Sequence, residues 1–172
     1  IAAGITLTAL ERWFGLEAAL VRCMPNTPAL VGSGASGLFA NARVSAAQRD
    51  IADQLLGAVG LSVWVDSEAD IDSVTALSGS GPAYFFLMME AMQESAVKLG
   101  LTPAMAKSLT YQTALGAAQL AIASEEDTAQ LRRNVTSPNG TTERAINHFE
   151  DGGLRQLVDG ALTAARDRSV EL

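Results

Sequence analysis

Apolar runs and helix-spaced apolar positions alternate over the first 66 residues of the chain. Short runs rich in β-forming residues predict strands at 19–23, 35–41 and 61–65. Between these runs, capping-box patterns followed by apolar residues at helical spacing predict helices at 6–16 and 45–57. Alternation of strand and helix is typical of an α/β layer.

The first predicted helix carries a capping-box pattern and a large aromatic residue. Thr8 and Glu11 have the capping-box spacing, and Leu10 and Trp13 follow at helical spacing. Large aromatic side chains bury much apolar surface, so Trp13 and Trp64 are both expected in the core.

The pattern beyond Asp66 is helical throughout. The predicted helices span 82–99, 103–124, 127–135, 141–149 and 154–169. Their starts carry Pro or a capping residue, and a Gly ends the first of them. We therefore place a boundary near residue 66, with an α/β domain over 1–66 and an all-α domain over 67–172.

Composition and charge restrict the partners. The 172 residues are 48% hydrophobic, and 12 basic against 19 acidic residues give a net charge of −7. An acidic chain repels nucleic acid and anionic membranes, so neither is an expected partner. With Cys23 and His148 as the single cysteine and the single histidine, no disulfide and no Cys- or His-based metal site is expected. A reduced, cytoplasmic setting is the expected location.

The first residues read as the end of a buried strand. Residue 1 is Ile, and the run over 1–5 is apolar with a Gly. We expect a truncated chain, with a processed terminus as the alternative. A strand end made of small residues, here Ala2-Ala3-Gly4, lets a flat ligand approach the backbone closely. Small residues end strands for packing reasons as well.

Two further segments suit a site but also have ordinary structural explanations. Over Arg22–Pro28, two prolines stiffen the exit from a strand and can present Asn26 and Thr27 as fixed polar groups. Leu77–Tyr84 is a Gly-rich approach to a helix start that matches neither the dinucleotide fingerprint nor the P-loop. It either binds an anion or allows close packing, and packing is favoured.

The segment Asn134–Glu143 gives the strongest local indication of a ligand site. Asn139-Gly140 is a turn signal, and Thr141 with Thr142 then opens a helix. Free N–H groups at such a helix start bind a carboxylate. An ordinary threonine cap is the alternative.

Taken in order, these four segments resemble the pyrroline-5-carboxylate reductase family. The quoted motifs are Ala-Ala-Gly-Ile, Arg-Cys-Met-Pro-Asn-Thr-Pro, Leu-Ser-Gly-Ser-Gly-Pro-Ala-Tyr and Ser-Pro-x-Gly-Thr-Thr. One departure is Asn139, where the family usually has Gly; Asn tolerates positive φ, so the turn is expected to survive. The resemblance implies that 1–66 is the last part of a Rossmann NAD(P)-binding domain. It implies that 67–172 is a helical dimerisation and substrate-binding domain.

The resemblance also implies an activity, partners and a set of site residues. The implied reaction is the reduction of 1-pyrroline-5-carboxylate to L-proline by NADPH or NADH, the last step of proline biosynthesis, in a homodimer or a larger ring. Thr142 is the implied catalytic residue, orienting the ring nitrogen. The implied substrate-binding residues are Glu68, Glu125, Ser137, Gly140, Thr141 and Thr142. The implied cofactor-binding residues are Ala3, Met24, Pro25, Asn26 and Asn134.

Two other functions stay open on the sequence. One is a related imine or β-hydroxyacid dehydrogenase with a similar two-domain plan. The other is a non-catalytic helical dimerisation module, favoured by the lack of a Gly-rich phosphate-binding loop in this chain.

Overall fold

The structure, a computed structural model, describes residues 4–172. It divides into two compact units, one of residues up to Tyr84 together with Asp159–Leu172 and the other of Phe85–Val158. The predicted cofactor contact Ala3 lies outside the described residues.

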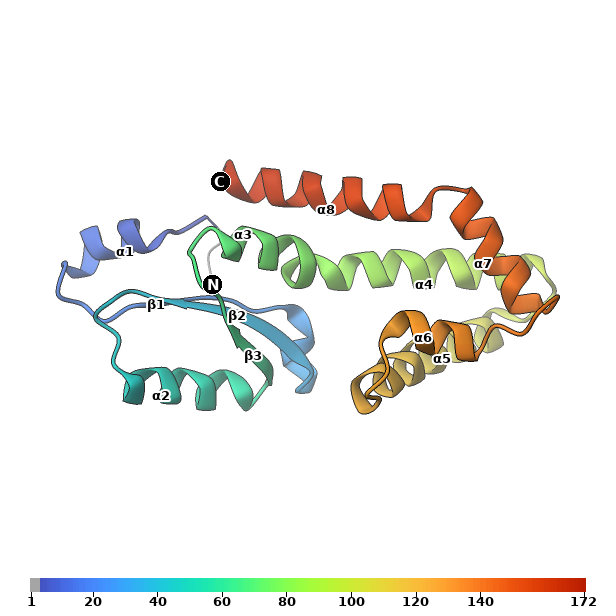
Figure 1. The fold of residues 1–172 in the computed structure, drawn as a ribbon, viewed down its shortest axis with the longest axis horizontal. Helices are drawn as coiled ribbons and strands as arrows, with labels where there is room; N and C mark the ends of the chain where they lie inside the picture. The colour runs from blue at the N-terminus through green and yellow to red at the C-terminus, as the bar shows by residue number, and fades with distance from the viewer. Residues whose placement is uncertain (1–3) are drawn as a thin grey trace. The chain divides into compact units, whose positions relative to one another are not determined.

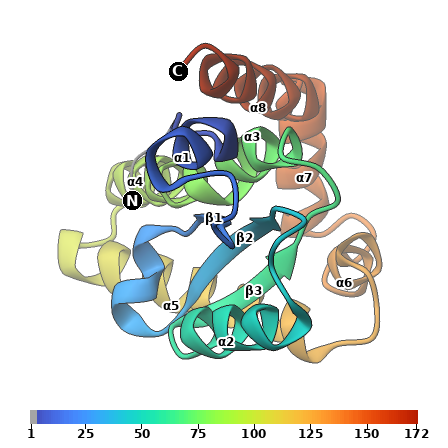
Figure 2. The same ribbon diagram turned by 90° about the vertical axis from the view of Figure 1, so that its left-hand side faces the viewer.

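The first unit contains a three-stranded sheet with helices on both faces (Figures 1 and 2). Its strands, in sheet order, are β1 (Val21–Met24), β2 (Gly34–Ala40) and β3 (Gly60–Trp64). β1 pairs antiparallel with β2, and β2 pairs parallel with β3. The helices of this unit are α1 (Leu7–Phe14), α2 (Ala46–Gly57) and α3 (Asp70–Val74). α2 covers one face of the sheet, and α1 and α3 lie on the other.

The core of this unit lies between β2 and α3. Leu38 on β2 and Ile71 on α3 are fully buried, each with a relative exposure of 0%. α3 approaches β2 closely because Gly37 has no side chain; a Cβ there would lie 2.6 Å from Val74 Cγ1.

The predicted helices and strands are found, and two details of α1 differ from expectation. Thr6, not Thr8, is its N-cap, and the Thr6 side chain accepts from the Ala9 N–H. The Leu7 N–H, which has no acceptor within the helix, donates to Glu68 Oε1 at 2.7 Å. In the part of the chain that the structure describes, Trp13 is 64% exposed, so the prediction that it lies in the core is wrong.

Polar side chains cap α2 and hold it against β3. The predicted capping box at Ser45 and Gln48 is present at the start of α2. Asp53 on α2 accepts from the Trp64 indole N–H and the Ser62 hydroxyl, each at 2.8 Å. These two hydrogen bonds, the Trp64 bond foremost, lower the pKa of Asp53. Trp64, which makes the first of these hydrogen bonds, is half-buried and lies against α2.

The rest of the chain is helical. Before it, η1 (Thr27–Val31) is a short 3-10 helix between β1 and β2, and η2 (Thr75–Gly79) is a π-helical turn that leads into α4. The helices are α4 (Gly81–Lys98), α5 (Pro103–Ala123), α6 (Thr128–Asn134), α7 (Thr141–Asp151) and α8 (Leu154–Val170). Thr102 and Asp127 cap α5 and α6 through their side chains, as their positions predict.

The expected fold class, part of a Rossmann layer followed by an all-α region, is confirmed. The boundary near residue 66 falls between β3 and α3, whereas the compact units separate within α4. Over residues 4–172, no helix has the length and apolar character needed to cross a membrane.

Candidate substrate and cofactor site

A tight turn joins α6 to α7 and sets the start of α7. The Gly140 N–H donates to Ser137 O at 3.0 Å, and Asn139 has φ of 60°, the positive value that its place in the turn predicts. Glu143 Oε2 accepts from the Asn139 N–H at 2.8 Å, which ties the first turn of α7 back to this turn. A Cβ on Gly140 would lie 2.7 Å from Ser137 Oγ and 3.0 Å from Ser137 O, so a side chain there would require Ser137 to shift.

The first turn of α7 presents unpaired donors. Its N-cap is Gly140, which has no side chain to cap the helix. Among the described residues, no acceptor is found for the N–H groups of Thr141, Thr142 and Glu143. Such groups carry partial positive charge at a helix start and suit a carboxylate. Thr142 is half-buried in this turn and is not the cap.

Asn134, at the end of α6, is tied to the loop before that helix. Asn134 Nδ2 donates to Glu126 Oε2, and Asn134 Oδ1 accepts from Gln130 Nε2, both at 2.7 Å. Glu125 is the exposed neighbour of Glu126 in the same loop. The structure thus places Asn134 beside the loop that carries Glu125.

In the other unit, the loop after β1 is fixed in place. Asn26 Oδ1 accepts from the Ala35 N–H at 2.9 Å, and Asn26 Nδ2 donates to Ser78 O at 3.0 Å. Met24 packs at Gly79, where a Cβ would lie 3.4 Å from its sulfur. Because 3.4 Å is an ordinary van der Waals distance, this contact does not require glycine, and the close packing predicted for the Gly-rich segment stays a prediction.

Glu68 holds two elements of the same unit together. Its Oε1 accepts from the Leu7 N–H at 2.7 Å and from Arg22 NH1 at 2.9 Å. The Arg22 side chain is only 11% exposed, so the pair is shielded from water. Next to Arg22, burial raises the pKa of the Cys23 thiol, which keeps it protonated and a poor nucleophile.

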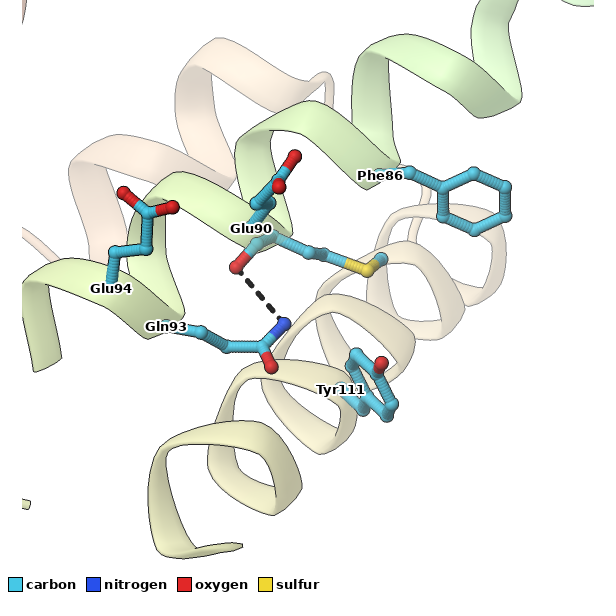
Figure 3. Close-up of a pocket in the computed structure, with 6 residues that line it drawn as sticks. Phe86, Glu90, Gln93, Glu94 and Tyr111 are labelled. Atoms are coloured by element: carbon cyan, nitrogen blue, oxygen red, sulfur yellow. Dashed lines mark hydrogen bonds between the residues drawn. The ribbon is translucent and has the colours of Figure 1, made fainter. Parts of the chain in front are cut away.

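A shallow hollow lies between α4 and α5 in the helical unit (Figure 3). It has a volume of about 430 Å³ and is lined by Phe86, Met89, Glu90, Gln93, Glu94 and Tyr111. Gln93 Nε2 donates to Met89 O at 3.1 Å. None of the predicted site residues lines this hollow.

Comparison with known proteins identifies the family. The family model described as pyrroline-5-carboxylate reductase dimerisation matches residues 68–172. This chain belongs to the pyrroline-5-carboxylate reductase family. It is 62% identical over 172 residues to the pyrroline-5-carboxylate reductase of Pseudomonas aeruginosa and 44% identical over 173 residues to that of Haemophilus influenzae. Both alignments include the whole of this chain, which spans 63% and 64% of the length of those two relatives.

Solved structures of the reductase family agree with the fold. The pyrroline-5-carboxylate reductase of Coxiella burnetii matches with a TM-score of 0.97 and 53% identity, over 99% of this chain and 63% of that one. The Plasmodium falciparum pyrroline carboxylate reductase, solved with NADP bound, matches with a TM-score of 0.89 and 32% identity. That match covers 97% of this chain and 66% of the other.

The site residues predicted from the resemblance to the reductase family fall in both units. Met24, Pro25, Asn26 and Glu68 lie in the unit that contains the sheet. The other predicted residues lie in the helical unit: Glu125, Asn134, Ser137, Gly140, Thr141 and Thr142. Ser137 and Gly140 share one turn at the start of α7, and Asn134 lies beside the loop that carries Glu125. The roles of all these residues stay predictions.

Sequence reasoning missed the ion pair of Arg22 with Glu68. The two residues are 46 positions apart, and no local spacing rule links them. A charged residue within a short apolar strand, such as Arg22, is only a weak indication that a partner of opposite charge lies nearby.

Proposed function

We propose that this chain is part of a pyrroline-5-carboxylate reductase, which reduces 1-pyrroline-5-carboxylate to L-proline with NADPH or NADH in the cytoplasm. The names of relatives up to 62% identical to the chain support this activity. The chain covers 63% of that relative's length, so the activity belongs to the whole protein. Residues 1–66 serve the nucleotide-binding domain, and 67–172 serve dimerisation and substrate binding.

The start of α7 is the observation that carries the proposal. The substrate is a cyclic imine with a carboxylate, and an anion suits the three unpaired N–H groups of Thr141–Glu143. Ser137 and Gly140 set the turn that directs these groups. Glu125, in the loop beside Asn134, and Glu68 are the other two residues that we assign to the substrate.

Thr142 is the residue that we assign to the ring nitrogen. A threonine hydroxyl is a weak acid, so it orients the imine by a hydrogen bond and passes on a proton from solvent. Once the imine nitrogen is protonated, the imine carbon is electrophilic, so most of the rate enhancement comes from positioning. A bound reduced nicotinamide supplies the hydride.

The residues assigned to the cofactor fit a planar nicotinamide ring. Met24 and Pro25 are half-buried; Met24 ends β1, and Pro25 starts the loop that two hydrogen bonds of the Asn26 amide hold. Apolar groups on a rigid loop suit the face of an aromatic ring. Asn134 and Ala3 complete the proposed nicotinamide contacts.

An assay of the complete natural protein tests the activity. With racemic 1-pyrroline-5-carboxylate, we expect oxidation of NADPH or NADH, read from the loss of absorbance of the reduced nicotinamide, and formation of L-proline by chiral chromatography. Reactions without the imine are the control. If the protein forms a dimer but oxidises neither cofactor, it is a non-catalytic dimerisation module and the proposal is wrong.

We also propose that the protein associates with a second copy of itself through α4 and α5. These helices expose large apolar side chains within their unit, for example Phe86 at 62%, Leu87 at 67% and Leu109 at 55%. Many large apolar side chains exposed on neighbouring helical segments are typical of an interface.

Light scattering at micromolar concentration is expected to give at least twice the subunit mass. Phe86→Glu is expected to weaken association at least tenfold, because it places a charge in the apolar interface. Leu61→Glu on β3 is the matched control, since Leu61 is 63% exposed but lies on neither helix. A stable wild-type monomer contradicts the proposal.

A further inference from the structure

The side chain of Asn26 closes one end of the β1–β2 ladder. The last pair of this ladder is Met24 with Gly37, so its register places Asn26 opposite Ala35. Pro25 interrupts the strand because it has no N–H. The Ala35 N–H therefore donates to Asn26 Oδ1, at 2.9 Å, in place of a backbone carbonyl.

The other end of the same amide satisfies a carbonyl that a proline leaves without a donor. In a continuous α-helix, Ser78 O would accept from the N–H of residue 82, which is Pro82 and has none. The next donor, the Ala83 N–H, bonds to Ser80 O at 3.0 Å. Asn26 Nδ2 donates to Ser78 O at 3.0 Å and fills the vacancy in the hydrogen-bond pattern.

One amide thus joins two segments that are far apart in the sequence. Ala35 is 9 residues from Asn26, and Ser78 is 52 residues away. Met24 makes a second contact between the same loop and turn, at Gly79. While both hydrogen bonds are present, the oxygen and the nitrogen of the Asn26 amide are each engaged with the protein backbone.

We propose that Asn26 is a positioning residue, which holds the Met24–Pro28 loop against the η2 turn in the geometry that receives the reduced nicotinamide. This inference rests on the proposed function, and it assigns the cofactor contact to the loop rather than to the Asn26 amide. Loss of either hydrogen bond releases the loop and weakens cofactor binding, while the chemical step on bound substrate changes little.

Asn26→Asp in the complete natural protein tests the proposal. It keeps the acceptor for Ala35 and replaces the donor to Ser78 with an oxygen, which faces the carbonyl oxygen and repels it. Steady-state kinetics are expected to show KM for the reduced nicotinamide raised at least fivefold and kcat within twofold of wild type. If this variant does not fold, Asn26→Ser, which is too short for both bonds, is judged by the same criterion.

Asn41 offers a matched control at the other end of the same ladder. Asn41 Oδ1 accepts from the Leu20 N–H at 3.2 Å, and its Nδ2 donates to Ala18 O and Glu11 Oε1. Asn41→Asp therefore disturbs an equivalent amide that does not contact η2, and its KM for the cofactor is expected to stay within twofold of wild type. Equal KM values for the Asn26 and Asn41 variants, raised or unraised, overturn the positioning role.

The outcome separates this inference from the proposed activity. A wild-type protein that does not turn over 1-pyrroline-5-carboxylate contradicts the proposed function. The Kd of NADPH, measured by fluorescence titration for the same variants, then decides the role of Asn26 on the same fivefold criterion. A wild type that binds neither NADPH nor NADH overturns the inference too.

Discussion

Replacing Thr142 by alanine is expected to lower kcat/KM for 1-pyrroline-5-carboxylate about tenfold or more in the complete natural protein. Loss of one directed hydrogen bond to the reacting imine costs at least ~1.4 kcal/mol of transition-state stabilisation. Stability should change little, because Gly140, not Thr142, occupies the N-cap of α7 and no side chain caps this helix. Steady-state kinetics and thermal unfolding of the same preparation measure the two effects.

Two companion variants sharpen the Thr142 experiment. Thr142→Ser keeps the hydroxyl and is expected to retain much of the activity. Thr102→Ala removes a true cap, since the Thr102 side chain accepts from the Met105 N–H. It is expected to cost about 1 kcal/mol of stability, a fall in Tm of a few degrees, and to leave kcat/KM nearly unchanged. A Thr142→Ala enzyme with wild-type kcat/KM would remove Thr142 from the site.

Gly60→Ala is expected to destabilise the sheet by about 2–5 kcal/mol, the sum of backbone strain and overpacking. Gly60 has φ of 151°, where L side chains are strained, and it opens β3. A Cβ at Gly60 would lie 2.0 Å from Gly34 O and 2.4 Å from Gly34 N. These are backbone atoms of the paired strand β2, so neither can move aside without breaking the ladder.

Denaturant unfolding at fixed protein concentration measures this loss, with Gly57→Ala as its control. Gly57 ends α2 three residues earlier, and a Cβ there would meet nothing within 4 Å. Alanine at 57 is expected to be neutral or to stabilise the protein by up to ~1 kcal/mol. A free energy of unfolding of Gly60→Ala within ~0.5 kcal/mol of the wild-type value is typical of a neutral surface substitution. That result would show that the contact with Gly34 is not rigid.

Local interactions made much of the fold readable from the sequence. The capping box at Ser45, the caps at Thr102 and Asp127 and the positive φ of Asn139 all follow from side chains that act on backbone within about four residues. The candidate carboxylate-binding start of α7 was predictable for the same reason, because the turn before it is made by adjacent residues.

The start of α1 shows where local reasoning stops. Thr8 and Glu11 have the spacing of a capping box, yet the helix begins two residues earlier with Thr6 as its cap. At this helix start the Leu7 N–H donates to Glu68, across 61 residues, a contact that no local pattern predicts. Trp13 on this helix is also exposed. Its burial could not be predicted, because helical spacing defines an apolar face but does not say which element covers that face.

The sequence by itself determined which segments are helix and strand, where most helices are capped and which turn carries free N–H donors, since these depend on neighbours along the chain. Only the tertiary structure decided the partners of Asn26 and Glu68. Asn26 reaches Ser78 across 52 residues, and Glu68 reaches Arg22 across 46. Contacts of this range form only when packing brings the segments together, because an unfolded chain loses too much conformational entropy to hold them.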